Sequence, residues 1–287
     1  MTNLLNLAMS SSKRTCPRFG FCSSVASVIA CPSDPVPEEM VSEPSAASEL
    51  GYSRSKWVAE HICESASRLP ALRGRVSIFR VGQLSGDTHK GVWNTKEAWP
   101  LMLSLVKLTR TLPDLDERLD WLPVDIAANG IVQGMSGDDD VGESTKGDEV
   151  KSTDGRPDVQ DGISGLGKAA KSVTDFVHIR HIVNARQNPT WSQMLEWLAA
   201  RQDFEVLEAK KWVVQLEERE HQGTQTHPAF NLLGLWQVYK RDGNDKPAKK
   251  KTFAVEQTEA KIPAMCAVGP IDEQYFLKIW KWIDANM

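Results

Sequence analysis

The spacing of hydrophobic and polar positions changes several times along the chain, and each change predicts a different element. Apolar residues three and four positions apart predict helices, whereas short continuous apolar runs predict buried strands. The expected helices cover residues 3–11, 52–62, 99–108, 122–132, 191–201, 211–220 and 273–285. The expected strands cover residues 18–24, 75–81, 176–183 and 204–207. Residues 31–48, which are rich in Pro, Ser and Glu, are expected to form a loop.

The order of these elements predicts the fold class. Helices and strands alternate along the chain, and this order is typical of an α/β protein with a parallel sheet. The strands at 18–24 and 75–81 are compact apolar runs, as expected for parallel strands that are covered on both faces.

A change in composition divides the chain into two parts. Residues 134–175 are rich in Gly, Asp, Ser and Lys and contain almost no large apolar side chains. Such a segment cannot bury enough apolar surface to become ordered, so we interpret it as a disordered insertion. The insertion separates residues 1–133 from residues 176–287.

Composition and charge argue against several classes of function. The net charge of −4 provides no basic field that would attract nucleic acid. No apolar run is long enough to cross a bilayer. The five cysteines are odd in number and show no C-x-x-C spacing, which favours a reduced, cytoplasmic protein. His178 and His181 form an H-x-x-H pair without a further ligand set at metal-site spacing, so no metal site is predicted.

Tyr52 and Lys56 are the clearest candidates for chemistry. Their i, i+4 spacing puts both side chains on one face of the expected helix. A nearby ammonium group stabilises a phenolate, so a tyrosine in such a pair can pass a proton to a carbonyl oxygen. The same lysine could hold the ribose of a nicotinamide cofactor. The spacing also occurs by chance, and a surface tyrosine beside a surface lysine is the alternative interpretation.

Two strand ends strengthen the catalytic interpretation. The strand at 18–24 ends in Ser23 and Ser24, and the strand at 75–81 runs into the sequence R-V-G-Q-L-S-G at 80–86. Ligands of parallel sheets bind at the carboxyl ends of strands. A serine hydroxyl at this edge could therefore hydrogen bond a substrate oxygen beside Tyr52.

Three motifs together resemble those of the extended short-chain dehydrogenases. They are F-C-S-S-V-A at 21–26, G-Y-x-x-S-K-W-V-A-E at 51–60 and R-V-G-Q-L-S-G-D at 80–87. More narrowly, the chain resembles the terminal thioester-reductase domains of fungal non-ribosomal-peptide-synthetase-like enzymes and carboxylic acid reductases. The stretches that support this narrower resemblance lie at 91–94, 98–102 and 121–128. Apart from the insertion, the resemblance covers nearly the whole chain.

The resemblance implies a site and a reaction. Ser24 would orient the substrate carbonyl, Tyr52 would be the acid, and Lys56 would assist Tyr52 and bind ribose. The backbone contacts to nicotinamide would come from Val81, Gly82, Gln83 and Leu84. The implied reaction is hydride transfer from NADPH to an acyl thioester on the phosphopantetheine arm of a carrier domain, with release of an aldehyde or an alcohol. Many members of this group have proline where Val81 stands.

The implied fold is α/β, with an incomplete Rossmann-type sheet in residues 1–133 and a smaller, substrate-binding C-terminal subdomain in residues 176–287. The sheet is expected to be incomplete because no Gly-rich turn for a pyrophosphate stands before Ser24. The sequence G-x-x-x-x-G-K at 162–168 is followed by Ala169 instead of the required hydroxyl residue, and we interpret it as linker. Two alternatives stay open: a non-catalytic remnant, and another extended dehydrogenase or epimerase that acts on a free small molecule.

Overall fold

The computed structural model describes residues 1–11, 17–136, 176–186, 188–222, 227–240 and 250–287. Most of the predicted insertion, residues 137–175, and the G-x-x-x-x-G-K sequence within it lie outside the described residues. No helix in the described ranges is both long enough and apolar enough to cross a membrane.

Helices and strands alternate along the described chain, and every strand pairing is parallel apart from one isolated bridge. The helices are α1 (Thr2–Met9), α2 (Gly51–Ser67), α3 (Ala98–Ser104), α4 (Val106–Thr109), α5 (Val124–Ser136), α6 (Trp191–Ala199), α7 (Ala209–His221), α8 (Leu233–Trp236), α9 (Glu256–Lys261), α10 (Pro263–Cys266) and α11 (Glu273–Asn286). The strands are β1 (Phe19–Ser24), β2 (Val76–Val81), β3 (Leu84–Ser85), β4 (Thr111–Asp114), β5 (Leu122–Pro123), β6 (Val177–Ile182) and β7 (Glu205–Glu208). The predicted α/β class is confirmed.

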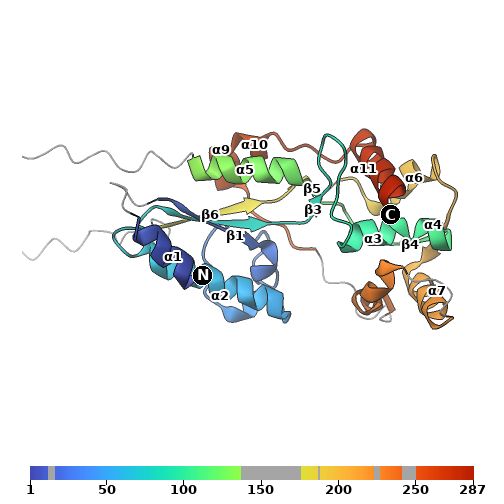
Figure 1. Cartoon of the computed structure of the whole chain (residues 1–287), viewed down its shortest axis with the longest axis horizontal. Coiled ribbons are helices and arrows are strands. Elements are labelled where there is room, and N and C mark those ends of the chain that lie inside the picture. Colours follow the sequence, from blue (N-terminus) through green and yellow to red (C-terminus); the bar gives the residue numbers. More distant parts are fainter. Residues whose placement is uncertain (12–16, 137–175, 187, 223–226, 241–249) are drawn as a thin grey trace, which may run out of the picture.

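Three parallel strands form the central sheet, in the order β1-β2-β6. Helices α1 and α2 cover one face, and α5, α9 and α10 cover the other (Figure 1). All six residues of the middle strand β2 are buried, because this strand has helices on both faces and a strand on each side. Strand β6 pairs with β2 and completes this sheet, although the sequence division places it with residues 176–287.

Helix α5 packs very closely on the sheet because glycine leaves room at the contact. A Cβ atom on Gly134 would lie 2.6 Å from Phe79 Cε1 and 2.9 Å from Ile262 Cδ1. On the opposite face, Cys63 of α2 packs with Ile78 of β2 in a separate apolar cluster. The sheet therefore has two cores, one under each layer of helices.

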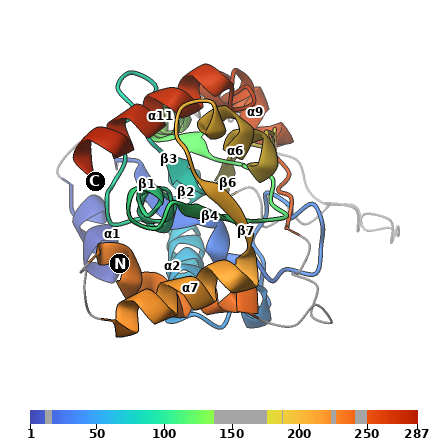
Figure 2. The same ribbon diagram turned by 90° about the vertical axis from the view of Figure 1, so that its right-hand side faces the viewer.

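A second group of elements lies beyond the carboxyl ends of these strands (Figures 1 and 2). It contains α3, α4, α6, α7, α8 and α11 around the two parallel strands β4 and β7. Its core is the largest apolar cluster among the described residues, and tryptophan contributes much of it. The buried tryptophans of this cluster are Trp93, Trp121, Trp191, Trp212, Trp236 and Trp280.

Two expected helices have wrong boundaries, and one strand was not expected. The helix expected at 99–108 is divided at Leu105 into α3 and α4. The helix expected at 122–132 begins only at Val124, because Leu122 and Pro123 pair with Leu84 and Ser85. Strand β4 was not expected, since its sequence T-L-P-D contains a proline, which is uncommon inside a strand. The two short strands involved, β4 and β5, each have a partner that is distant in sequence.

Candidate active site

One face of helix α2 lies over the carboxyl end of β1 and presents Tyr52 and Lys56 there. The Lys56 ammonium donates a hydrogen bond to the backbone oxygen of Cys22, with a distance of 2.9 Å between Nζ and O. Lys56 Nζ also lies 5.1 Å from the centre of the Phe21 ring and 5.7 Å from that of the Tyr52 ring. The i, i+4 pair that the sequence predicts is therefore assembled at the end of β1.

The Tyr52 side chain is open to solvent, with 57% of its surface exposed. Within the described residues, no hydrogen bond joins its hydroxyl group to Ser24 or Lys56. The hydroxyl is therefore accessible to a molecule that binds at this edge of the sheet.

The neighbouring serines of β1 have different surroundings. Ser23 is buried, and its hydroxyl donates to Glu60 Oε1 at 2.5 Å. Ser24 is half-buried and begins the short 3₁₀ turn Val25–Ser27, where its Oγ accepts from the backbone N–H of Ala26 at 3.2 Å. A hydroxyl that accepts still has its own proton to give. Ser24 can therefore donate to a carbonyl oxygen, whereas the Ser23 proton is used inside the protein.

The segment that contains Val81, Gly82, Gln83 and Leu84 lies on the next strand, beside Ser24. In the parallel register Ser24 is opposite Val81. The Gly82 backbone N–H donates to β6, and the side-chain amide of Gln83 donates to the Leu84 backbone oxygen at 2.8 Å. The structure thus brings all seven predicted site residues to the carboxyl edge of β1 and β2.

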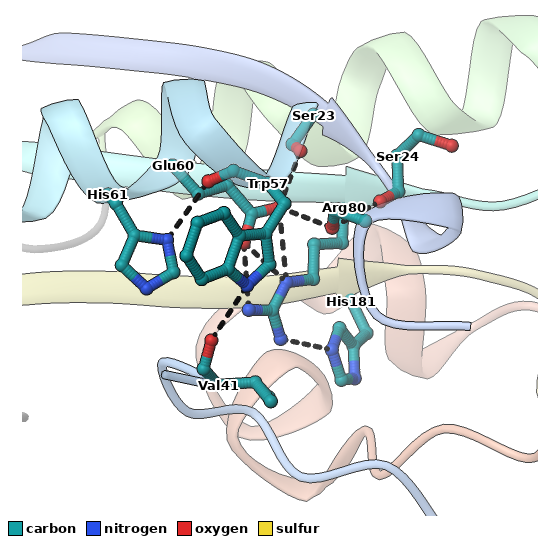
Figure 3. Close-up of polar contacts among 9 residues, drawn as sticks. Ser23, Ser24, Val41, Trp57, Glu60, His61, Arg80 and His181 are labelled. Atoms are coloured by element: carbon teal, nitrogen blue, oxygen red, sulfur yellow. Dashed lines mark hydrogen bonds and ion pairs between the residues drawn. The ribbon is translucent and has the colours of Figure 1, made fainter. Parts of the chain in front are cut away.

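A row of buried polar residues, which was not predicted from the sequence, lies beneath α2 (Figure 3). The register aligns Ser23 of β1, Arg80 of β2 and His181 of β6. All three are buried, with exposed fractions of 3%, 0% and 0%. The aligned row two residues earlier is entirely apolar and consists of Phe21, Ile78 and Ile179. The detectable signal was a polar residue at the same position near the end of three apolar strands.

The carboxylate of Glu60, on α2, accepts hydrogen bonds from this polar row. Its Oε1 accepts from Ser23 and, at 2.6 Å, from the Ser27 hydroxyl. Its Oε2 accepts from Arg80 Nη2 at 2.9 Å and Arg80 Nε at 3.1 Å, which makes a two-pronged ion pair. The side chains of Arg80 and Glu60 are 0% and 1% exposed. Because buried charges are costly without partners, this degree of pairing is what their burial requires.

His181 is neutral in this environment. Burial, assisted by the adjacent Arg80 guanidinium, lowers its pKa from 6.5 to about 3. Its Nδ1 lies 2.7 Å from the backbone oxygen of Ala254, which can only accept, so Nδ1 has the proton. Nε2 then accepts from Arg80 Nη1 at 3.4 Å. Across the described ranges, no group of three or more His, Cys, Asp or Glu side chains could hold a metal ion.

The N-terminal part of the chain is similar to a known family and to several known proteins. Residues 1–131 match the NAD-binding family described as male sterility protein. An adenylate-forming reductase of Aspergillus terreus is 35% identical over 138 residues, which cover 45% of this chain and 12% of that protein. A non-canonical non-ribosomal peptide synthetase of Acremonium egyptiacum is 36% identical over 135 residues, which cover 46% of this chain and 12% of that protein. The chain therefore spans a small part of these curated relatives.

Solved structures share the fold over most of the chain. The terminal R domain from the myxalamid PKS-NRPS biosynthetic pathway aligns with a TM-score of 0.62 and 20% identity, over 93% of this chain and 58% of that chain. The reductase (R) domain of a nonribosomal peptide synthetase from Mycobacterium tuberculosis aligns with a TM-score of 0.63 and 14% identity, over 93% and 60%. Residues 1–131 therefore match the NAD-binding family described as male sterility protein, and the chain shares its α/β fold with these reductase domains.

Proposed function

We propose that this chain is part of a reductase that uses NADPH to reduce a carrier-bound acyl thioester to an aldehyde or an alcohol. The observation on which this rests is that Ser24, Tyr52, Lys56 and residues 81–84 meet at one edge of the sheet. The similarity of residues 1–131 to an NAD-binding family, and of the chain to adenylate-forming reductases, supports the same conclusion.

The nicotinamide half of a cofactor fits the residues present at this edge. A lysine ammonium has three N–H donors, and Lys56 uses one of them on Cys22. Two donors remain for ribose hydroxyls, while the backbone of residues 81–84 would flank the nicotinamide. The cofactor, when bound, supplies the hydride.

Ser24 and Tyr52 would then act on the substrate. The Ser24 hydroxyl donates a hydrogen bond to the thioester oxygen and fixes its position. Tyr52 gives its proton to this oxygen as the carbonyl carbon gains the hydride, and the Lys56 ammonium favours the phenolate that remains. Breaking the carbon–sulfur bond releases the aldehyde and the thiol of the carrier. Addition of a second hydride and proton to the aldehyde would give the alcohol.

The partner in this proposal is a carrier domain whose phosphopantetheine arm reaches Tyr52 from the solvent side. Residues 176–287 would supply most of the substrate-binding subdomain. We place the protein in the cytoplasm, a compartment in which thiols stay reduced. The free thiols of Cys22, Cys31, Cys63 and Cys266 support that location.

Cofactor binding is the decisive test. We expect the purified chain to bind NADPH, measured by fluorescence or calorimetry, and Lys56→Ala to weaken binding by about tenfold or more through the loss of the ribose contact. Tyr52→Phe is the matched variant: it should bind NADPH nearly as well and lose on the order of 10²-fold or more in turnover of a carrier-linked thioester, because it lacks the acid. NADH measured in parallel tests the choice of cofactor.

A non-catalytic role is the second candidate. A folded chain that does not bind NADPH or NADH at millimolar concentration would contradict the stand-alone reductase and support this candidate. Turnover of a free small molecule, without a carrier, would instead support another extended dehydrogenase or epimerase.

A further inference from the structure

We propose that the buried Glu60–Arg80 pair is a positioning device, which holds helix α2 in the register that places Tyr52 and Lys56 over the end of β1. This inference rests on the proposed function of that edge, because it assigns Glu60 and Arg80 a role in the same site. Neither residue faces the edge where substrate would bind, since both side chains are buried between α2 and the sheet (Figure 3).

The spacing on α2 connects the pair to the site. Tyr52, Lys56 and Glu60 are each four residues apart, so they form one stripe along the helix. Lys56 binds the backbone oxygen of Cys22, and Glu60 binds the hydroxyl of the next residue, Ser23. Two successive turns of α2 therefore hold two successive residues of β1, directly before Ser24.

A single carboxylate joins four parts of the site. Glu60 belongs to α2, Ser23 to β1, and Ser27 to the turn that begins at Ser24. Arg80 belongs to β2 and directly precedes Val81, the first of the predicted nicotinamide contacts. A lateral or rotational shift of α2 relative to β1 and β2 would break at least one of these bonds.

Stability alone is a weak reason for such a pair. Buried ion pairs can often be replaced by apolar residues of similar volume without loss of stability. The preceding row of Phe21, Ile78 and Ile179 shows that the sheet can pack apolar side chains at this face. An apolar contact does not fix the orientation of the two side chains. A two-pronged guanidinium–carboxylate pair fixes both the distance and the angle between the two groups. The polar row is also the one nearest the catalytic edge.

The test uses the full chain and the double variant Glu60→Leu with Arg80→Met. The same helix offers a matched control: Glu64 and Arg68 form an ion pair one turn further on, with 12% and 60% of their side chains exposed. The control variant is Glu64→Leu with Arg68→Met. Three properties are measured: the Tm, the affinity for NADPH, and the rate at which acetic anhydride labels Lys56. Lys211, with 74% of its side chain exposed, is the internal reference for labelling.

We expect the Glu60–Arg80 double variant to stay folded, with a lowered Tm because the buried Ser23 hydroxyl and His181 Nε2 lose their partners. Below that Tm, Lys56 should be acetylated severalfold faster than in the wild type, because Nζ is no longer held on Cys22, and the Kd for NADPH should rise about tenfold. The Glu64–Arg68 control should change none of these values. A folded double variant with unchanged Lys56 labelling would overturn the proposal.

Two further arms separate the possible failures. If the wild type itself does not bind NADPH, the proposed function fails, while the Lys56 labelling still decides the positioning role. If the double variant does not fold, Ser23→Ala with Ser27→Ala removes the links from Glu60 to β1 and its turn, and leaves the ion pair in place. Faster Lys56 labelling in that folded variant supports the proposal, and unchanged labelling contradicts it.

Discussion

At the scale of single residues, the buried His181 links stability to pH. In the unfolded chain a histidine has an ordinary pKa of about 6.5, whereas the folded value is about 3. The unfolded state therefore binds a proton first as the pH falls, and the folded state loses stability through the window from about 6.5 down to about 3. Above pH 6.5 His181 is neutral in both states, so its titration no longer lowers the free energy of unfolding.

We expect the free energy of unfolding to fall below pH 6.5, with His181 responsible for at most about 1.4 kcal/mol per pH unit. Urea unfolding at pH 7.5 and pH 5 measures this loss. His181→Gln, which cannot titrate, should lose less stability between the two pH values than the wild type does. An identical loss in both proteins would show that His181 is not the titrating group.

The structure is also needed to decide which of two neighbouring serines can hydrogen bond the substrate. Ser23 and Ser24 are adjacent and chemically identical, and the sequence favoured Ser24 only through a resemblance. The fold buries Ser23 against Glu60 and leaves Ser24 at the edge. The side-chain alternation of a strand makes this difference, and it depends on which face α2 covers.

At the scale of elements, the contact of α5 with β2 depends on Gly134. Alanine normally stabilises a helix relative to glycine by roughly 1 kcal/mol. At this position, however, the added Cβ would lie 2.6 Å from Phe79 and 2.9 Å from Ile262. Phe79 is fully buried, so it has little room to move, and the steric cost outweighs the gain in helix propensity.

We therefore expect Gly134→Ala to lower the free energy of unfolding by about 1–3 kcal/mol. Gly234 in α8 is the matched control, since a Cβ there has no neighbouring atom within 4 Å. Gly234→Ala should leave stability unchanged or raise it by up to roughly 1 kcal/mol. Denaturant unfolding of both variants tests this, and equal effects would contradict the close packing of α5.

At the scale of the whole molecule, Tyr275 on α11 connects the second group of elements to the segment that follows β2. Its hydroxyl donates to the backbone oxygen of Gly86 at 2.6 Å and lies 2.7 Å from Ser85 Oγ. Burial raises the pKa of Tyr275 well above the usual range, so it stays protonated and keeps this donor. Gly91, with a φ of +72°, lets the same segment approach the backbone of Lys278 on α11.

Tyr275→Phe should lower the free energy of unfolding by about 1–3 kcal/mol, because the Gly86 oxygen loses its donor inside the protein. Tyr52→Phe removes a hydroxyl that is exposed and should leave stability nearly unchanged. Thermal or denaturant unfolding of the two variants compares the loss of a tyrosine hydroxyl at the buried contact of Tyr275 with the same loss at the exposed Tyr52. Equal stability of both variants would mean that this junction contributes little.

The sequence by itself determined the local elements and the i, i+4 pair. Helix α2 and the strands β1, β2 and β6 follow from apolar spacing, because a residue's neighbours three, four or two positions away fix which face it joins. The positions of Tyr52 and Lys56 on one helix face follow from the same local geometry. The resemblance added Ser24 and residues 81–84, and the fold brings them to one edge with the pair.

Only the tertiary structure decided what lies beneath that edge. Arg80 and His181 are 101 positions apart in the chain, and the register of the β2–β6 pairing alone places them side by side. The short ladder of β4 and β7 likewise exists only because Thr111 and Glu205 are brought opposite one another. Local spacing records which face of an element is apolar. It does not record the register between distant elements, because register is set by the packing of the whole sheet.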